Sequence, residues 1–357
     1  MTTNELPREV RQLLVEAEPV PMVDQTALIA DFRNEAAART SLGLQILSIC
    51  GAYLASAFLL GFVFTLGVYD SPLGFTVTGL LLLVGGYLLE RLRGGVAGAA
   101  FNVSLTVNGF ALLFFGLSEY IDSVSEAACL VGSTAAVLLA LHTNRVIVFL
   151  ATVTVAASVH TLAYEALGHY GVHLTVGLFT GLLLAWSAGE ARLIAGSRWA
   201  NRRYDAIRTG LIFGLLVGAY YLSDYRWWVD ERPTHNWLAS LALIPAVGWV
   251  AHTELRRFGA DPARRRAYLL GVGALLLPTF FAPALSAPLF VLLVSWRNGH
   301  RTGTVVGVIA LAYALGRYYY DLNLTLLHKS YVLVATGLLF LGAYALLRSK
   351  LSADEAD

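Results

Sequence analysis

Charged side chains are scarce in this sequence. Only 14% of its 357 residues are Asp, Glu, Lys or Arg, whereas ordinary soluble domains carry about 25%. Hydrophobic residues make up 57% of the chain, and the mean hydropathy is +0.64. The length alone would suggest about two or three soluble domains, but long apolar runs fill most of it. The composition therefore excludes an ordinary soluble protein and indicates a membrane protein.

Cysteine is also nearly absent. The two cysteines, Cys50 and Cys129, both lie inside apolar runs. They cannot supply a disulfide framework, and we expect both to be small buried hydrophobic residues. The sequence lacks a Walker loop, a dinucleotide-binding glycine pattern, and GxSxG, HExxH and CxxC motifs. We therefore expect no catalytic residue, no cofactor and no nucleic-acid partner.

Long apolar segments are what the sequence has in abundance. A membrane span needs about 20 residues, within a range of roughly 17–25. The segments predict an all-α fold, a polytopic bundle of about 12 transmembrane helices. Two segments, 267–282 and 284–297, are short, so they form either two spans or one re-entrant pair. The segments fall near residues 42–68, 73–89, 96–118, 124–141, 145–164, 170–189, 207–223, 237–254, 267–282, 284–297, 303–321 and 328–347.

The positions of the positive charges predict the orientation of this bundle. Cytoplasmic loops carry an excess of Lys and Arg. With the N-terminus in the cytoplasm, all but four of the 25 Lys and Arg residues face inward. Both termini are then cytoplasmic. We expect a cytoplasmic amphipathic helical segment over 1–40, a transmembrane domain over 41–348 with a central cytoplasmic linker at 190–206, and a cytoplasmic tail over 349–357.

The outward-facing cations lie in two loops that are rich in Tyr and Trp. Residues 220–237 contain Arg226, Trp227, Trp228 and Arg232. Rings at this depth are typical of an aromatic belt at the headgroup level. They also suit a docking surface on the outer face, and both interpretations stay open.

The second loop, residues 316–330, contrasts most sharply with its apolar neighbours. If the preceding helix continues into it, Arg317 and Asp321 are four residues apart and within reach of an ion pair. The two cations and Asp321 would then neutralise one another in a turn, or the loop is a polar docking surface. The candidate partner-binding residues of this loop are Arg317, Tyr318, Tyr319, Tyr320, Asp321, Thr325, His328 and Lys329.

The stretch YYYDLNLTLLHKSYVLVATGLLFL resembles the terminal signature of a bacterial membrane family, domain of unknown function 4401. The matching positions are Tyr319, Tyr320, Leu322, Thr325, Leu326, Leu327, Lys329, Ser330 and Gly337. The resemblance implies a multi-pass protein of the bacterial inner membrane. It also implies a small membrane-anchored partner, named for a GDYXXLXY motif, that is often encoded beside it. No reaction follows from the resemblance.

Three other groups of polar residues are weaker candidates. His169 and His173 are four residues apart and are weak candidates for a metal pair. We expect structural or pH-responsive surface histidines and no metal site. An acidic rim of Glu119, Asp122 and Glu126 is either a solvated loop, with Ser123 or Ser125 capping the next helix, or an electrostatic dock. Polar stripes run along two expected helices, where such residues most often hydrogen-bond between helices. The stripes are Asn102, Ser104, Thr106 and Asn108 in one helix, and Thr152, Thr154, Ser158 and His160 in the other.

These observations leave three hypotheses for function. The leading one is a membrane scaffold or binding subunit that docks a membrane-anchored periplasmic partner on its outer face. The second is a transporter of a small or amphiphilic solute that uses the polar stripes as its path. The third is an intramembrane enzyme acting on a lipid-linked substrate, with Asp321, His328 and Lys329 around one cavity.

Overall fold

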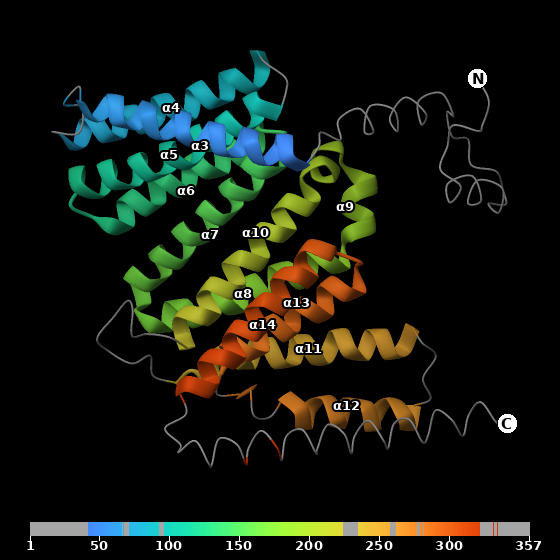
Figure 1. The fold of residues 1–357 in the computed structure, drawn as a ribbon. Coiled ribbons are helices and arrows are strands. Elements are labelled where there is room, and N and C mark those ends of the chain that lie inside the picture. Colours follow the sequence, from blue (N-terminus) through green and yellow to red (C-terminus); the bar gives the residue numbers. More distant parts are fainter. Residues whose placement is uncertain are drawn as a thin grey trace, which may run out of the picture. The chain divides into compact units, whose positions relative to one another are not determined.

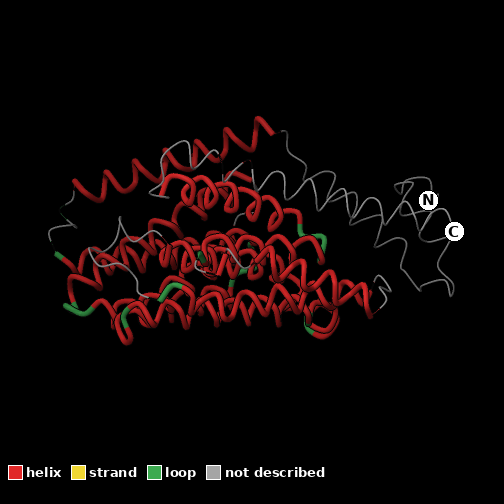
Figure 2. The backbone as a smooth tube through the Cα atoms, turned by 90° about the horizontal axis from the view of Figure 1, so that it is seen from below, coloured by secondary structure: helices red, strands yellow, loops and turns green. Residues whose placement is uncertain are grey.

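A computed structural model gives the fold of the chain (Figure 1). It describes residues 42–65, 67, 71–92, 96–223, 235–257, 262–276, 279–280, 282–321, 331 and 334. The regular structure in these residues is helical, with no strand among them (Figure 2). The expected segment 1–40, most of 220–237, residues 322–330 and the tail 349–357 lie outside the described residues.

The chain divides into two compact units, residues 1–116 and 117–357. The first unit contains α3 (Leu42–Thr65), α4 (Pro72–Leu92) and most of α5 (Val96–Tyr120). Helices α4 and α5 approach closely because glycines face each other across the contact. A Cβ atom added at Gly79 would lie 2.6 Å from the backbone nitrogen of Leu113, and one added at Gly109 would lie 2.8 Å from Leu83. Small residues of this kind are the usual means of packing helices in a membrane.

The second unit is a larger helical bundle. Its helices are α6 (Val124–Leu141), α7 (Arg145–Leu167), α8 (His169–Ala188), α9 (Glu190–Gly196), α10 (Arg198–Ser223), α11 (Trp237–Arg257), α12 (Pro262–Leu276), α13 (Pro283–Arg297) and α14 (Arg301–Asp321). The central helix is α10, which packs against α7, α8 and α13. The core between these helices is apolar and fully buried, as at Val176, Leu183, Leu215 and Phe290. Short turns connect most of the helices, so successive helices run in opposite directions (Figure 1).

Glycines set the contact between α10 and α7. Gly210, Gly214 and Gly218 recur every four residues on α10. They lie against Thr152, Ala156 and His160, which have the same spacing on α7. A Cβ atom at Gly214 would lie 2.8 Å from the Cβ of Ala156, and one at Gly218 would lie 2.5 Å from His160. The two backbones therefore pack closely over two helical turns.

Apolar helices of membrane-spanning length dominate the described residues. Seven of them are long and apolar enough to cross a bilayer, and Tyr53–Thr65 and Pro283–Arg297 are shorter apolar helices. This finding indicates a membrane protein, as the composition predicted. Helix α6 has the predicted bounds, and its cap is Ser123, whose Oγ accepts a hydrogen bond from the backbone N–H of Glu126 at 3.4 Å.

Two features differ from the expectation. The predicted linker 190–206 is mostly helical, because it contains α9 and the first turns of α10. Cys129 is exposed on α6, so the prediction that it is buried was wrong. An apolar segment in a membrane protein shows part of its surface to lipid, and apolar character therefore does not imply burial inside the protein. The side chain of Cys50 lies outside the described set.

The short helices α12 and α13 meet at the opposite end of the bundle from Arg257. The backbone N–H of Ala284 donates to the Oγ of Ser223, the last residue of α10, at 3.2 Å. The ring of Phe280 stacks on Trp237, the first residue of α11, with centroids 6.2 Å apart. The turn between α12 and α13 is therefore level with the end of α10 and the start of α11.

Candidate functional site

Arginine gathers at one end of the second unit. Within the part of this unit that the structure describes, every arginine except Arg317 lies at the end made by residues 139–145, 186–208, 249–266 and 295–304. We call this the arginine-rich end. The opposite end, called the acidic end, is made by residues 117–126, 164–173, 220–223, 235–237, 279–286 and 317–321. It carries the exposed carboxylates Glu119, Asp122, Glu126 and Glu165.

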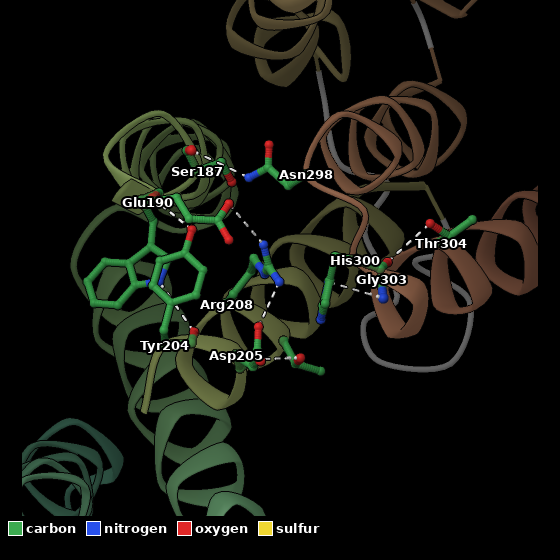
Figure 3. A network of polar contacts seen from close by, with 11 residues as sticks. Ser187, Glu190, Tyr204, Asp205, Arg208, Asn298, His300, Gly303 and Thr304 are labelled. Carbon is green, nitrogen blue, oxygen red and sulfur yellow. Dashed lines mark hydrogen bonds and ion pairs between the residues drawn. The ribbon is translucent and has the colours of Figure 1, made fainter. Parts of the chain in front are cut away.

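Arg208 is the buried centre of a polar network at the arginine-rich end, in which the side chain of Asp205 is 58% exposed (Figure 3). Arg208 is only 4% exposed. Nη2 donates to Oδ1 of Asp205 at 2.7 Å, and Nη1 lies 3.6 Å from Oε2 of Glu190. Its guanidinium also lies 4.9 Å from the ring centre of Tyr204. A buried charge is tolerated only when it is paired in this way.

Tyr204 connects this network to the end of α8. Its hydroxyl donates to the backbone oxygen of Trp186 at 3.0 Å. The two rings stack with an interplanar angle of 13°. Because Glu190 starts α9, these contacts fix the turn between α8 and α10.

His300 starts α14 on the other side of Arg208. Its Nδ1 accepts a hydrogen bond from the backbone N–H of Gly303 at 3.2 Å, so the imidazole acts as an N-terminal cap. Burial, followed by the positive charge of Arg208, lowers the pKa of His300 to about 4, against a smaller opposing effect of Asp205. A neutral imidazole is required here, since protonation of Nδ1 would remove the acceptor of the cap.

A second buried ion pair ties α11 to α13. Glu254 is 9% exposed, and its Oε1 lies 3.1 Å from Nε of Arg297 and 3.1 Å from Nη1 of Arg257. Arg297 also donates to the Oγ1 of Thr253 at 3.1 Å. These contacts fix the ends of two helices that lie far apart in the sequence.

Arg203, on α10, caps the C-terminus of helix α6 with its side chain. Its Nε donates to the backbone oxygen of Leu139 and its Nη2 to that of Ala140, both at 3.1 Å. The last carbonyls of a helix lack intrahelical partners, and a cation is favoured there by the helix dipole. The indole N–H of Trp199 donates to Ala140 as well, at 3.2 Å.

The predicted docking residues lie at the acidic end or outside the described residues. Arg317 is half-buried on α14, which continues through Asp321. The side chains of Tyr318, Tyr319, Tyr320 and Asp321 are not described. Residues Arg226, Trp227, Trp228, Thr325, His328 and Lys329 also lie outside the described residues. The predicted docking surface therefore stays a prediction.

The two histidines considered as metal ligands have separate aromatic neighbours. The ring of His169 lies 5.7 Å from Tyr164 and 6.1 Å from Tyr221, whereas His173 lies 6.4 Å from Tyr170. Within the described residues, no group of three or more His, Cys, Asp or Glu side chains could hold a metal ion. At the acidic end these two histidines therefore lie among aromatic rings, and His173 is buried there.

Most of the polar stripe residues bond to the helices themselves. Thr106, Thr152 and Thr154 each donate to the carbonyl four residues earlier, at 2.8–2.9 Å. Asn108 donates to Ser56, and so joins α5 to α3. These residues thus use their side chains to bond within or between helices, whereas the buried amide of Asn102 has no hydrogen-bond partner among the described residues.

His160 joins three helices. Its Nε2 lies 2.9 Å from the backbone oxygen of Gly214, which can only accept, so Nε2 carries the proton. Nδ1 then accepts from the hydroxyl of Thr175 at 2.6 Å. This polar contact ties α7 to α8 and α10.

The sequence interpretation missed the buried network, because it used these arginines only to assign sidedness. One signal was available for the packing: glycines at positions 210, 214 and 218 predict a close helix contact. The spacing of three residues between Asp205 and Arg208, and between Glu254 and Arg257, was also a signal for ion pairs. No spacing reveals the partners on other helices, Glu190 and Arg297.

Comparison with known proteins agrees with the resemblance in the terminal signature. A family model described as "Domain of unknown function (DUF4401)" matches residues 42–350. No curated protein and no solved structure matches the chain. Since the family match covers well over half of the 357 residues, the chain belongs to the family defined by domain of unknown function 4401.

Proposed function

We propose that this protein is a scaffold or binding subunit of the bacterial inner membrane. It has about twelve spans and both termini in the cytoplasm. Its outer face docks a membrane-anchored periplasmic partner of the GDYXXLXY type. In this orientation the arginine-rich end is cytoplasmic and the acidic end faces the periplasm.

The observation that carries this proposal is the separation of charge between the two ends. At the arginine-rich end, each described carboxylate forms an ion pair with a buried or half-buried arginine. These carboxylates are Glu190, Asp205 and Glu254. At the acidic end, Glu119, Asp122, Glu126 and Glu165 are exposed and form no ion pair with other described residues. Excess positive charge marks the cytoplasmic side, and uncompensated surface charge steers a complementary partner.

Aromatic residues at the acidic end support the same conclusion. Tyr120 and Tyr170 are exposed beside the carboxylates. Tyrosine is enriched where partner proteins bind tightly, because one flat ring offers much contact area with little loss of side-chain entropy. The predicted docking residues 316–330 contain three more tyrosines, which we expect at the acidic end.

The transporter hypothesis has less support. Its path was to be the polar stripes of α5 and α7, but Thr106, Thr152 and Thr154 are bonded within their own helices, and His160 and Asn108 bond to neighbouring helices. Such contacts hold helices together. The enzyme hypothesis rests on Asp321, His328 and Lys329, and no described contact brings them together.

Affinity purification in mild detergent tests the proposal. The tagged protein is co-expressed with the GDYXXLXY-type protein, and Lys329→Ala and Tyr320→Ala are compared with the wild type. We expect recovery of the partner to fall by at least about tenfold in each variant, while the thermal midpoint stays nearly unchanged.

Matched controls come from the arginine-rich end and from the adjoining turn of α12. Arg301→Ala removes an exposed cation, and Tyr268→Ala removes an exposed tyrosine. Both should retain the partner. Loss of the partner together with loss of stability in the Lys329 and Tyr320 variants would return residues 316–330 to the role of a structural turn.

A further inference from the structure

The corner between α8 and α10 has the features of a lipid contact. Helix α9 lies in this corner, and none of its seven residues is buried. Arg192, Arg198 and Arg202 are all exposed along the corner. We infer that residues 190–202 form a binding surface for anionic phospholipids of the bilayer, a role separate from the partner dock at the acidic end.

These three arginines are available for a ligand. Their neighbours Arg203 and Arg208 are buried and bonded to the protein, whereas Arg192, Arg198 and Arg202 form no ion pair or side-chain hydrogen bond with described residues. The nearest carboxylate, Glu190, is 31% exposed and is paired with Arg208. The corner therefore presents positive charge that nothing in the described structure neutralises.

Arg198 does not serve the stability of its helix. Arg198 is the first residue of α10, and the first turn of that helix contains no acidic residue. A cation at a helix N-terminus opposes the helix dipole and is unfavourable there. The placement of Arg198 is explained if an anion lies against the corner.

Apolar side chains of the corner point to a lipid rather than to a soluble anion. Trp199 is 41% exposed and Ile194 is 37% exposed. The hydrogen bond from Trp199 to Ala140, at 3.2 Å, holds the indole at the surface. Tryptophan and arginine together at the end of a span are typical of the headgroup level, where the ring contacts acyl chains and the guanidinium meets phosphate.

The position of the corner fits that depth. It joins Ala188, the last residue of α8, to the first residue of α10, and both helices are long and apolar enough to span a membrane. The planar fork of Arg binds phosphate oxygens in pairs and is weakly hydrated, which suits a phosphodiester at an interface. An anionic headgroup such as that of phosphatidylglycerol meets all of these requirements.

Lipid binding to the purified protein tests the inference. The protein in neutral detergent is titrated with phosphatidylglycerol or with phosphatidylcholine, and retained lipids are counted by native mass spectrometry. We expect preferential retention of phosphatidylglycerol, weakened by added salt. The triple variant Arg192→Gln/Arg198→Gln/Arg202→Gln should bind it about a hundredfold more weakly. Each arginine near the surface contributes about fivefold to the affinity, and the three factors multiply.

Two further variants separate a local surface from general charge. Arg192→Lys/Arg198→Lys/Arg202→Lys keeps the charge and should retain most of the preference. Arg256→Gln/Arg266→Gln/Arg301→Gln removes three other exposed arginines of the same end and should stay within about threefold of the wild type. If the first glutamine variant fails to fold by gel filtration, the single change Arg198→Gln, expected to weaken binding about fivefold, replaces it.

Several results would overturn the inference. Equal retention of the two lipids, or equal loss in the two glutamine variants, would show that no specific surface exists. Displacement of phosphatidylglycerol by the same concentration of glycerol phosphate would assign the corner to a soluble phosphate. Unchanged lipid binding together with loss of a co-purifying acidic protein would assign it to a protein partner.

Discussion

At the scale of single residues, Arg208 shows how this protein keeps a charge inside a helical bundle. The guanidinium is held by a short bond to Asp205, a longer ion pair to Glu190 and the face of Tyr204. Removing one carboxylate leaves the buried cation less compensated. The network therefore serves to fix how α8, α9 and α10 meet.

This arrangement predicts unequal costs for the two carboxylates. Asp205→Asn removes the charge from the 2.7 Å bond and should lower the free energy of unfolding by about 1–2 kcal/mol. Glu190→Gln removes the charge from the longer ion pair, at 3.6 Å. It should cost less than 1 kcal/mol, about half the cost of Asp205→Asn. The double variant should cost more than the sum, because it leaves Arg208 without a counterion. Denaturant titration in detergent measures all three, and strict additivity would argue against one shared network.

His300 gives the arginine-rich end a dependence on pH. Its pKa is about 4 in the folded protein against an ordinary value of 6.5, so between these values the unfolded chain binds more protons. The contribution of His300 to stability is therefore present above pH 6.5 and is lost as the pH falls towards 4. Arg208 and Asp205 are the charged groups that act on this imidazole.

A cap that does not titrate tests this effect. Asn is a good N-terminal cap, so His300→Asn should keep α14 intact and flatten the fall of the thermal midpoint between pH 6.5 and 4. The matched control His252→Asn, on α11, should keep the wild-type profile. The same slope in the His300 variant and in the wild type would mean that other groups dominate the acid response.

At the scale of helices, hydropathy located most of the elements but misplaced the starts of α10 and of α12, which was predicted from 267 and begins at Pro262. It predicted 124–141 and 145–164, and the structure has α6 at Val124–Leu141 and α7 at Arg145–Leu167. It started another helix at 207, whereas α10 begins at Arg198. The early turns of α10 are polar in sequence and are held by contacts of Arg203 and Tyr204 with distant residues. A local pattern cannot reveal partners of this kind.

Helix contacts built on glycine depend on the missing side chain. Gly210→Ala would place a Cβ 2.5 Å from Thr152, and Gly214→Ala would place one 2.8 Å from Ala156. Each change should lower stability by about 1–3 kcal/mol through overpacking. Gly181→Ala on α8 is the control, because its Cβ would meet nothing within 4 Å. That change should be neutral or stabilise by up to about 1 kcal/mol. Equal effects at all three positions would exclude a specific close contact.

At the scale of the whole molecule, the charge distribution predicts the orientation in the membrane. Reporter fusions after residues 93, 200, 262 and 350 should report a cytoplasmic location. Fusions after residues 70, 122 and 230 should report the outside. A cytoplasmic signal after residue 122, which follows α5, would reverse the orientation proposed from α6 onward.

The number of spans depends on the pair α12 and α13. Each has 15 residues, or about 22 Å of helix, which is less than the roughly 30 Å hydrocarbon core. The lengths of α12 and α13, taken alone, are therefore compatible with a re-entrant pair that does not cross the membrane. The contacts argue otherwise, because Ala284 bonds to the end of α10 and Phe280 stacks on the start of α11. The 26 residues of α10 and the 21 of α11 are long enough to cross a membrane. We therefore expect the turn that reaches their ends to lie on the same side as those ends.

We therefore expect two spans, with the turn near Ala282 open to the acidic end. Ala282→Cys in a Cys50→Ala/Cys129→Ala background should react, in intact cells, with a maleimide that does not cross the inner membrane. Thr302→Cys, at the exposed start of α14, is the control and should react only after the membrane is opened. A re-entrant turn would bury residue 282 at membrane depth, and it would then stay unlabelled under both conditions. Labelling of both cysteines only in opened membranes would place the turn on the cytoplasmic side. That result would contradict the position inferred from the contacts of the turn with Ser223 and Trp237.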